Sequence, residues 1–298
     1  MLNQGGVRIG KVFIVGAGRM GIGIAEVCAR SGYDVLLEDT SDEMLAKGME
    51  AINRSVERAV AKGKIEGSAK ALLARIKTTT DLELAREADF VIESVFENLG
   101  LKREIFRQLD RICREDVILA TNTSGIPITE IAEATQRPDK VVGTHFFNPA
   151  PIQKIVEVIK GIVTSQETLE TAMTFCGSLK KEVIRINRDV QGFALVRIDI
   201  ASYVEAMKLV EEGVASVEDI DKGFRLGYGR PMGPFETRDF AGLDIGLPVL
   251  ENLYRETGDT KFLPPMILRR KIKAGHLGRR VGVGWYRYDE KGQKLGQA

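Results

Sequence analysis

His145 and Glu157 are the side chains whose types and surroundings best suit proton transfer. His145 is one of only two histidines, and it follows residues 141–142, which predict the end of a strand. Asn148-Pro149 should stop regular structure, and residues 155–159 predict a return strand with Glu157 in its middle. Such strands would bring imidazole and carboxylate together, and an imidazole can accept and return a proton near neutral pH. A histidine held by a backbone carbonyl in a packed turn is the alternative for this stretch taken alone.

A glycine-rich turn near the start of the chain predicts a dinucleotide site. Residues 11–15 are a continuous apolar run, as expected of a strand buried on both faces of a parallel sheet. In the GAGRMG sequence that follows, Gly16 suits the tight turn and Gly18 lets backbone approach a pyrophosphate. Gly21 lets the next helix press on the strand, and the N-terminus of that helix would point at the phosphates.

Asp39 indicates which dinucleotide binds. It ends a second strand, residues 33–37 with Glu38, about 20 residues beyond the glycines, where an acidic side chain accepts the ribose hydroxyls. Thr40 and Ser41 follow without an arginine that could bind a 2′-phosphate. The pattern favours NAD over NADP.

Polar residues also follow two later strands of the predicted sheet. Residues 89–93 precede Glu97-Asn98, and residues 117–120 precede the polar loop 121–125. In open α/β sheets, ligands bind at the carboxyl ends of the strands. These side chains should therefore lie beside the dinucleotide site.

A long helix beginning at Ser41 should have one apolar and one basic face. Its basic face includes Arg58 and Lys62, with Ser55 beside them. This face is either simply solvated or a cationic strip for a phosphorylated substrate, and periodicity alone does not decide between them.

Composition excludes several classes of protein. Lys plus Arg number 43 against 42 for Asp plus Glu, so no strong field attracts nucleic acid. The three cysteines are far apart in apolar helical patterns, which fits buried thiols in a reducing, cytoplasmic compartment better than disulfides or metal ligands. Residues 1–10 lack the apolar segment of a signal peptide, and no apolar run approaches the roughly 20 residues of a membrane span. We expect neither a membrane nor a metal to be bound.

The order of the elements predicts an α/β protein of two domains. Residues 1–188 should form a Rossmann-like NAD-binding domain with a mostly parallel sheet, whose last strand is residues 182–186. Residues 189–298 should form an all-helical domain. Its first helix, near residues 193–207, is apolar on most sides and should be widely buried, as a core helix or at a subunit interface.

These features, in this order, resemble the short-chain L-3-hydroxyacyl-CoA dehydrogenases, also called 3-hydroxybutyryl-CoA dehydrogenases. The resemblance extends over nearly the whole chain. Besides the glycine-rich turn, the stretches that carry it are Glu93 with Glu97-Asn98, Asn122-Thr123-Ser124, His145-Phe146-Phe147-Asn148-Pro149, Val156-Glu157-Val158-Ile159, Gly192-Phe193, Pro231-Met232-Gly233-Pro234-Phe235-Glu236 and Gly282-Val283-Gly284-Trp285-Tyr286.

The resemblance implies catalytic roles for three residues. His145 corresponds to the acid/base of the family's HFFNP motif, Glu157 to the carboxylate that orients it, and Ser124 to the serine that touches substrate and nicotinamide. The implied reaction interconverts an L-3-hydroxyacyl-CoA, such as 3-hydroxybutyryl-CoA, and the 3-ketoacyl-CoA, with NAD as cofactor. A carboxylate on one ring nitrogen fixes the tautomer and stabilises the imidazolium, which suits this proton transfer.

The same resemblance implies binding roles. Residues expected near the cofactor, besides the glycines and Asp39, are Glu97, Lys102, Asn122 and Arg280, the last where family members often have lysine. Residues expected near CoA are Ser55, Arg58 and Lys62, which favours the cationic-strip interpretation of their helix. Members of the family dimerise through the helical, substrate-binding domain, so the resemblance also implies a homodimer through this domain.

Residues 189–197 depart from the family pattern. Gln191 replaces a proline, and Val196 replaces an asparagine counted among the family's active-site residues. A lost hydrogen bond there could cost about 1 to 3 kcal/mol. The departure fits a slower enzyme, a water in place of the amide, or a changed substrate such as a free hydroxy acid or sugar acid. A non-catalytic NAD-binding protein is the remaining alternative.

Overall fold

The computed structural model describes residues 9–63, 65 and 68–298, and the chain divides into two compact units after Val190. Residues 1–8, which belong to the stretch predicted to lack a signal peptide, lie outside the described residues. Among the helices of the described part, none is long and apolar enough to cross a membrane.

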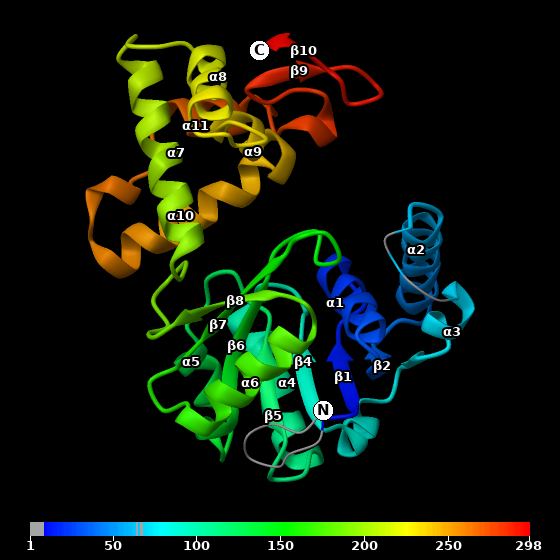
Figure 1. Ribbon diagram of the computed structural model, residues 1–298. Helices are drawn as coiled ribbons and strands as arrows, with labels where there is room; N and C mark the ends of the chain where they lie inside the picture. The colour runs from blue at the N-terminus through cyan, green and yellow to red at the C-terminus, as the bar shows by residue number, and fades with distance from the viewer. Residues whose placement is uncertain (1–8, 64, 66–67) are drawn as a thin grey trace. The chain divides into compact units, whose positions relative to one another are not determined.

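The first unit is built on an eight-stranded sheet in the order β3-β2-β1-β4-β5-β6-β7-β8 (Figure 1). Its strands are β1 (Lys11–Val15), β2 (Asp34–Glu38), β3 (Ile76–Thr79), β4 (Phe90–Glu93), β5 (Ile118–Thr121), β6 (Val141–Phe146), β7 (Ile155–Ile159) and β8 (Glu182–Ile186). Neighbouring strands are parallel except β6 and β7, which are antiparallel. The prediction of a mostly parallel Rossmann-like sheet is confirmed.

Helices cover the sheet because its central strands are apolar on both faces. Ile14 and Ile92 join one buried cluster with residues of α1, α2 and α6, whereas Phe13 and Val91, equally buried, alternate to the opposite side of the strands. The helices of this unit are α1 (Arg19–Arg30), α2 (Asp42–Ala61), α3 (Ala69–Leu73), α4 (Leu99–Ile112), α5 (Ile128–Ala132) and α6 (Gln166–Ser178), with a 3-10 turn η1 (Leu82–Glu87).

Local sequence signals account for α2. The Ser41 hydroxyl accepts a hydrogen bond from the backbone N–H of Met44, so the predicted N-cap is confirmed. Leu45, Ile52 and Val56, which recur at helical spacing, are buried. Tertiary packing therefore buries the apolar face of α2 and leaves its basic face toward solvent.

The second unit is mainly helical, with α7 (Leu195–Glu211), α8 (Val217–Gly227), α9 (Pro234–Ala241), α10 (Leu243–Thr257) and α11 (Met266–Lys273). It also contains an antiparallel pair, β9 (Tyr286–Tyr288) and β10 (Lys294–Gln297), that the sequence did not lead us to expect. Strands this short show no measurable alternation. Buried Asp239 fixes the start of the pair by accepting the backbone N–H groups of Trp285 and Tyr286 at 2.8 and 2.9 Å.

Most residues of helix α7 are buried or half-buried, and only Ile198, Glu205 and Glu211 are exposed. Ile200, Val204 and Met207 belong to the core of the second unit, whereas Ile198 on another face is 63% exposed. The packing of one chain thus agrees with the prediction of a widely buried helix, with Ile198 as its one exposed apolar residue.

Candidate active site

His145 and Glu157 face each other across the antiparallel strands β6 and β7. The register pairs the two residues directly, and His145 Nδ1 lies 2.8 Å from Glu157 Oε2. The Glu157 side chain is fully buried and His145 is 6% exposed. Their predicted proximity is confirmed.

The contact orients the imidazole. An ionised carboxylate can only accept a hydrogen bond, so Nδ1 carries the proton and Nε2 has the lone pair of a base. The Phe147 ring, whose centroid is 4.6 Å from that of His145, further restricts the orientation of the imidazole. Burial reduces solvent screening, which strengthens the attraction between the carboxylate and a protonated imidazole.

The loop after β5 is tied to the same end of the sheet. The side-chain amide of Asn122 donates to Ser94 Oγ at 3.2 Å, and its Oδ1 accepts the backbone N–H of Phe146 at 2.9 Å. Asn122 therefore connects the ends of β4 and β5 to the residue after His145. Ser124 follows in this loop and is exposed.

The glycine-rich turn has the shape that a dinucleotide requires. Gly16 has a φ of 99°, which L side chains rarely adopt, and a Cβ at Gly21 would lie 1.8 Å from the Gly16 carbonyl oxygen. A Cβ at Gly18 would meet no described atom within 4 Å, so the backbone there is open to a ligand. The turn leads directly into α1, whose N-terminus can bind phosphate.

Asp39 lies beside this turn. Its carboxylate accepts the backbone N–H of Ala17 at 2.9 Å and that of Ser41 at 3.1 Å. These bonds fix an acceptor at the carboxyl end of β2, where the ribose of a dinucleotide is bound in this kind of fold. The residues present thus fit NAD.

Glu38, the neighbour of Asp39, should make the stability of the first unit depend on pH. Burial, and then the charge of Asp39, raise the pKa of Glu38 to about 7. The folded state thus holds the Glu38 proton more tightly than the unfolded state does. The protonated carboxyl therefore favours the folded state, and this stabilisation is lost as pH rises through about 7. We expect wild type to lose about 2 kcal/mol relative to Glu38→Gln between about pH 5 and pH 8.

Urea unfolding at both pH values measures this difference. Glu43→Gln, on the exposed first turn of α2, is the matched control and should not alter the pH dependence. A constant difference between wild type and Glu38→Gln at the two pH values contradicts the prediction.

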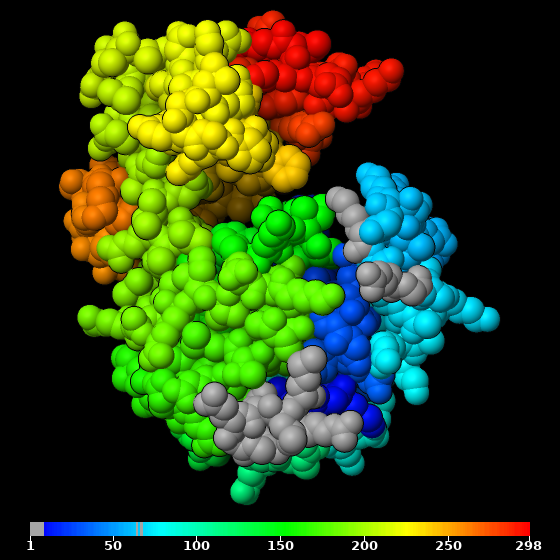
Figure 2. Space-filling view, in the orientation of Figure 1, coloured from blue at the N-terminus to red at the C-terminus, as the bar shows by residue number. Residues whose placement is uncertain are grey.

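The expected CoA-binding residues lie in α2 and at its C-terminal end, and Figure 2 shows this helix at the surface of the first unit (light blue). Arg58 and Lys62 are exposed. The Ser55 hydroxyl donates to Glu26 Oε1 of α1 at 3.0 Å. Sequence reasoning missed Glu26, a buried carboxylate whose pKa is raised mainly by burial. A charge among the apolar residues of α1 was the available signal.

The remaining expected cofactor residues are found in different surroundings. Lys102 is fully buried, and its Nζ lies 2.8 Å from Glu93, which sequence reasoning did not identify as a partner. Glu97 accepts the backbone N–H of Ser124 at 2.9 Å. Arg280 belongs to the second unit, where it forms an ion pair with Asp244. Within the described ranges, no group of three or more His, Cys, Asp or Glu side chains could hold a metal.

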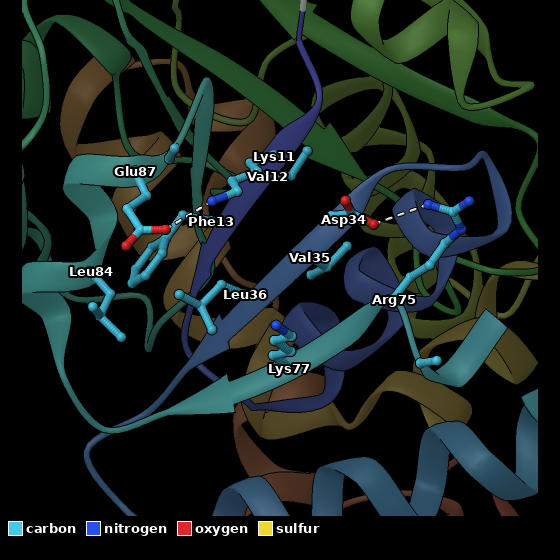
Figure 3. A pocket seen from close by; sticks show the side chains of 12 residues that line it. Lys11, Val12, Phe13, Asp34, Val35, Leu36, Arg75, Lys77, Leu84 and Glu87 are labelled. Atoms are coloured by element: carbon cyan, nitrogen blue, oxygen red, sulfur yellow. Dashed lines mark hydrogen bonds and ion pairs between the residues drawn. The ribbon is translucent and has the colours of Figure 1, made fainter. Parts of the chain in front are cut away.

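A cavity of about 350 Å³ lies against the amino-terminal halves of β1 and β2 (Figure 3). Ion pairs of Lys11 with Glu87 and of Arg75 with Asp34, 2.8 and 3.0 Å long, line it. Lys11 and Asp34 begin the strands whose other ends carry the glycine-rich turn and Asp39. The cavity is therefore separate from the candidate active site.

Comparison with known proteins gives consistent matches over both units. Residues 11–190 match the family model described as 3-hydroxyacyl-CoA dehydrogenase, NAD binding domain, and residues 192–288 match 3-hydroxyacyl-CoA dehydrogenase, C-terminal domain. The probable 3-hydroxybutyryl-CoA dehydrogenase of Bacillus subtilis is 42% identical, over 96% of this chain and 99% of that protein. The mitochondrial hydroxyacyl-coenzyme A dehydrogenase of Mus musculus is 40% identical, over 95% and 92%. The crystal structure of (S)-3-hydroxybutyryl-CoA dehydrogenase from Ralstonia eutropha is 42% identical, with a TM-score of 0.91 over 95% of this chain and 100% of that one.

Proposed function

The chain belongs to the 3-hydroxyacyl-CoA dehydrogenase family and is an NAD-dependent enzyme, and on this premise we propose that His145 is its acid/base and that Glu157 orients it. The observation that supports these roles is the 2.8 Å contact between His145 Nδ1 and Glu157 Oε2 across β6 and β7. This contact supports Nε2 as the proton acceptor. The relatives named as 3-hydroxybutyryl-CoA dehydrogenases support a short-chain substrate.

The proposed residues divide the reaction between them. When bound, NAD accepts the hydride from C3 of the hydroxyacyl group. Oxidation is complete only when the hydroxyl proton also leaves, and His145 Nε2 takes it. The carboxylate of Glu157 stabilises the imidazolium that forms, and the Ser124 hydroxyl donates to the substrate oxygen as charge develops on it. In the reverse direction, His145 returns the proton to the same oxygen.

The loss of NADH absorbance with acetoacetyl-CoA tests this proposal. We expect wild type to turn over this substrate faster than long-chain 3-ketoacyl-CoAs. Failure to reduce any 3-ketoacyl-CoA, with NAD bound normally, would favour a non-catalytic NAD-binding protein. Faster turnover of long-chain substrates would overturn only the short-chain assignment.

A free hydroxy acid is the second candidate substrate, because Gln191 and Val196 depart from the family pattern. Against it, the exposed Arg58 and Lys62, in the last turn and at the C-cap of α2, offer two cations suited to the phosphates of CoA. We expect Lys62→Ala to raise KM for acetoacetyl-CoA, and free 3-hydroxybutyrate to be oxidised much more slowly than its CoA ester. Val196→Asn restores the asparagine that is usual in the family, and it is the comparison variant for this departure from the family pattern.

Cofactor selectivity should depend on Asp39. Asp39→Ser removes the carboxylate that would accept the ribose hydroxyls, and hydrogen bonds to charged groups contribute about 1.5 to 3 kcal/mol. We therefore expect the preference in kcat/KM for NAD over NADP to fall about 10- to 100-fold. Asp42→Ser, on the exposed first turn of α2, is the control. An unchanged ratio in Asp39→Ser contradicts this role.

A homodimer through the second unit is the proposed assembly. Large apolar side chains are exposed on or just beyond several of its helices, including Ile198, Leu226, Tyr228, Phe240 and Ile245. Contiguous exposed apolar surface is unfavourable in water unless a partner covers it. Light scattering should give twice the mass of the chain.

A further inference from the structure

The ammonium of Lys181, directly before β8, binds the loop that connects His145 to the return strand β7. Its Nζ donates to the backbone carbonyls of Ala150 and Gln153 at 2.6 and 2.5 Å. The Lys181 side chain is half-buried, and burial, followed by the charge of Arg30, lowers the pKa of its ammonium. An ammonium that is partly removed from water depends on such acceptors, so the lysine and the loop hold each other in place.

The same loop also rests on α1. At Gly23, a Cβ would lie 3.2 Å from both Ala150 Cβ and Pro151 Cδ, which is closer than most Cβ contacts in proteins. Glycine at this position therefore lets the loop approach the helix. Helix α1 is itself fixed by its side chains in the core of the first unit. The loop is thus held at two points, by a rigid helix and by the Lys181 ammonium.

The loop also forms part of the surroundings of His145. The ring of Phe147, the second residue after His145, lies with its centroid 4.6 Å from that of the imidazole. A turn follows at once, in which the Pro149 carbonyl accepts the backbone N–H of Ile152 at 2.9 Å. The hydrogen bond to Glu157 fixes the Nδ1 atom, whereas packing contacts determine the plane of the imidazole ring. Displacement of the turn would therefore move Phe147 and let the imidazole tilt.

We propose that Lys181 is a positioning residue, which holds residues 148–153 and thereby keeps Phe147 against His145, so that Nε2 points at the substrate hydroxyl. It acts through the loop and not by contact with the substrate, because its ammonium binds two carbonyls of the loop. A lysine that served stability alone would change the free energy of unfolding and leave kcat as it is. The inference rests on the proposed role of His145 as the acid/base.

Steady-state kinetics with NADH and acetoacetyl-CoA test the inference. Displacement of a reacting group by about 1 Å costs up to about 100-fold, and here Glu157 still binds the imidazole. We therefore expect Lys181→Met to lower kcat about tenfold, while the KM for acetoacetyl-CoA and the Kd for NAD change by less than about twofold. Lys181→Arg, whose guanidinium also donates to carbonyls, should restore most of the activity. Lys180→Met, which removes the exposed neighbouring ammonium, is the matched control and should keep the kcat of wild type.

A double-mutant cycle tests the route through Phe147. Phe147→Leu keeps an apolar side chain but removes the ring that packs on the imidazole. In this background, Lys181→Met should lower kcat by about twofold or less, because the contact through which it acts is already lost. An equal loss in both backgrounds would show that Lys181 does not act through Phe147, and the inference would be wrong.

Different outcomes separate the inference from the proposed function. If His145→Asn keeps the kcat of wild type, the proposed acid/base role fails, and the inference fails with it. If His145→Asn lowers kcat but Lys181→Met does not, or if Lys181→Met mainly weakens NAD binding, only the inference is overturned. Equal losses of kcat in Lys181→Met and Lys181→Arg would likewise overturn it alone.

A second variant covers the case in which Lys181→Met does not fold. Gly23→Ala adds a Cβ against the loop, and α1 should still form because alanine favours helix more than glycine does. The loop must then shift by a few tenths of an ångström, so we expect kcat to fall about threefold, and to fall no further than this in the Phe147→Leu background than Phe147→Leu alone. Gly223→Ala in α8, where an added Cβ has open space, is the control. An unchanged kcat in Gly23→Ala would show that the position of the loop does not affect the reaction, which overturns the inference.

Discussion

His145→Asn is expected to lower kcat by about 10²- to 10⁴-fold, the range that a positioned general base supplies. An asparagine side chain can still form hydrogen bonds in the space of the imidazole, but it cannot take up the hydroxyl proton. Glu157 would then have no imidazolium to stabilise. NADH absorbance with acetoacetyl-CoA measures the fall in kcat, and the Kd for NAD should change little because the glycine-rich turn is unaltered.

His276→Asn is the matched control for this prediction. His276 is the other histidine of the chain and belongs to the second unit. It should retain the kcat of wild type. A loss below about tenfold in His145→Asn would mean that water or another group accepts the proton, and the proposed acid/base role would be wrong.

Those parts of the fold that depend on local sequence could be predicted. The limits of β1 and β8 and the N-cap of α2 agree with the sequence, because an apolar run or a capping serine acts within a few residues. β3 and α5 were not predicted. β3 is a four-residue edge strand with two exposed side chains, and α5 has only five residues, so neither is long enough for its hydrophobic pattern to be recognised.

The candidate site likewise contains pairs of residues that could be predicted from the sequence and pairs that could not. His145 and Glu157 could be paired from the sequence because two adjacent strands and a short connection bring them together. The pairing of Glu93 with Lys102 could not be predicted from the sequence. In a helix, Lys102 looks like an ordinary solvated lysine, and only the packing of α4 beside the end of β4 buries it. Ser55 and Glu26 likewise meet because α1 packs against α2. Such pairs depend on tertiary contacts that hydrophobic periodicity does not encode.

The antiparallel pairing of β6 and β7 also has a chemical consequence. In an otherwise parallel sheet, this reversal places His145 and Glu157 at directly opposed positions, so that the two side chains share one face. A fully buried carboxylate is tolerated there because the imidazole pairs with it. The same contact that stabilises the strand pair therefore sets the tautomer.

Glu157→Gln is expected to lower kcat by about 10²- to 10³-fold, although it changes almost nothing in size. The amide can donate to Nδ1, which would move the histidine proton to Nε2 and leave a donor where the reaction needs an acceptor. In a hydrolase triad, the corresponding change costs about 10⁴-fold. We expect a smaller loss, because the glutamine can also turn its oxygen toward Nδ1 and retain the active tautomer in part of the molecules.

Two comparisons make this prediction specific to the pair. Glu182→Gln, at the exposed start of the neighbouring strand β8, should leave kcat unchanged. In the His145→Asn background, Glu157→Gln should cause little further loss, since residues that act as one unit are not additive. If the two losses multiply instead, Glu157 acts on the reaction independently of His145, and its orienting role would have to be abandoned.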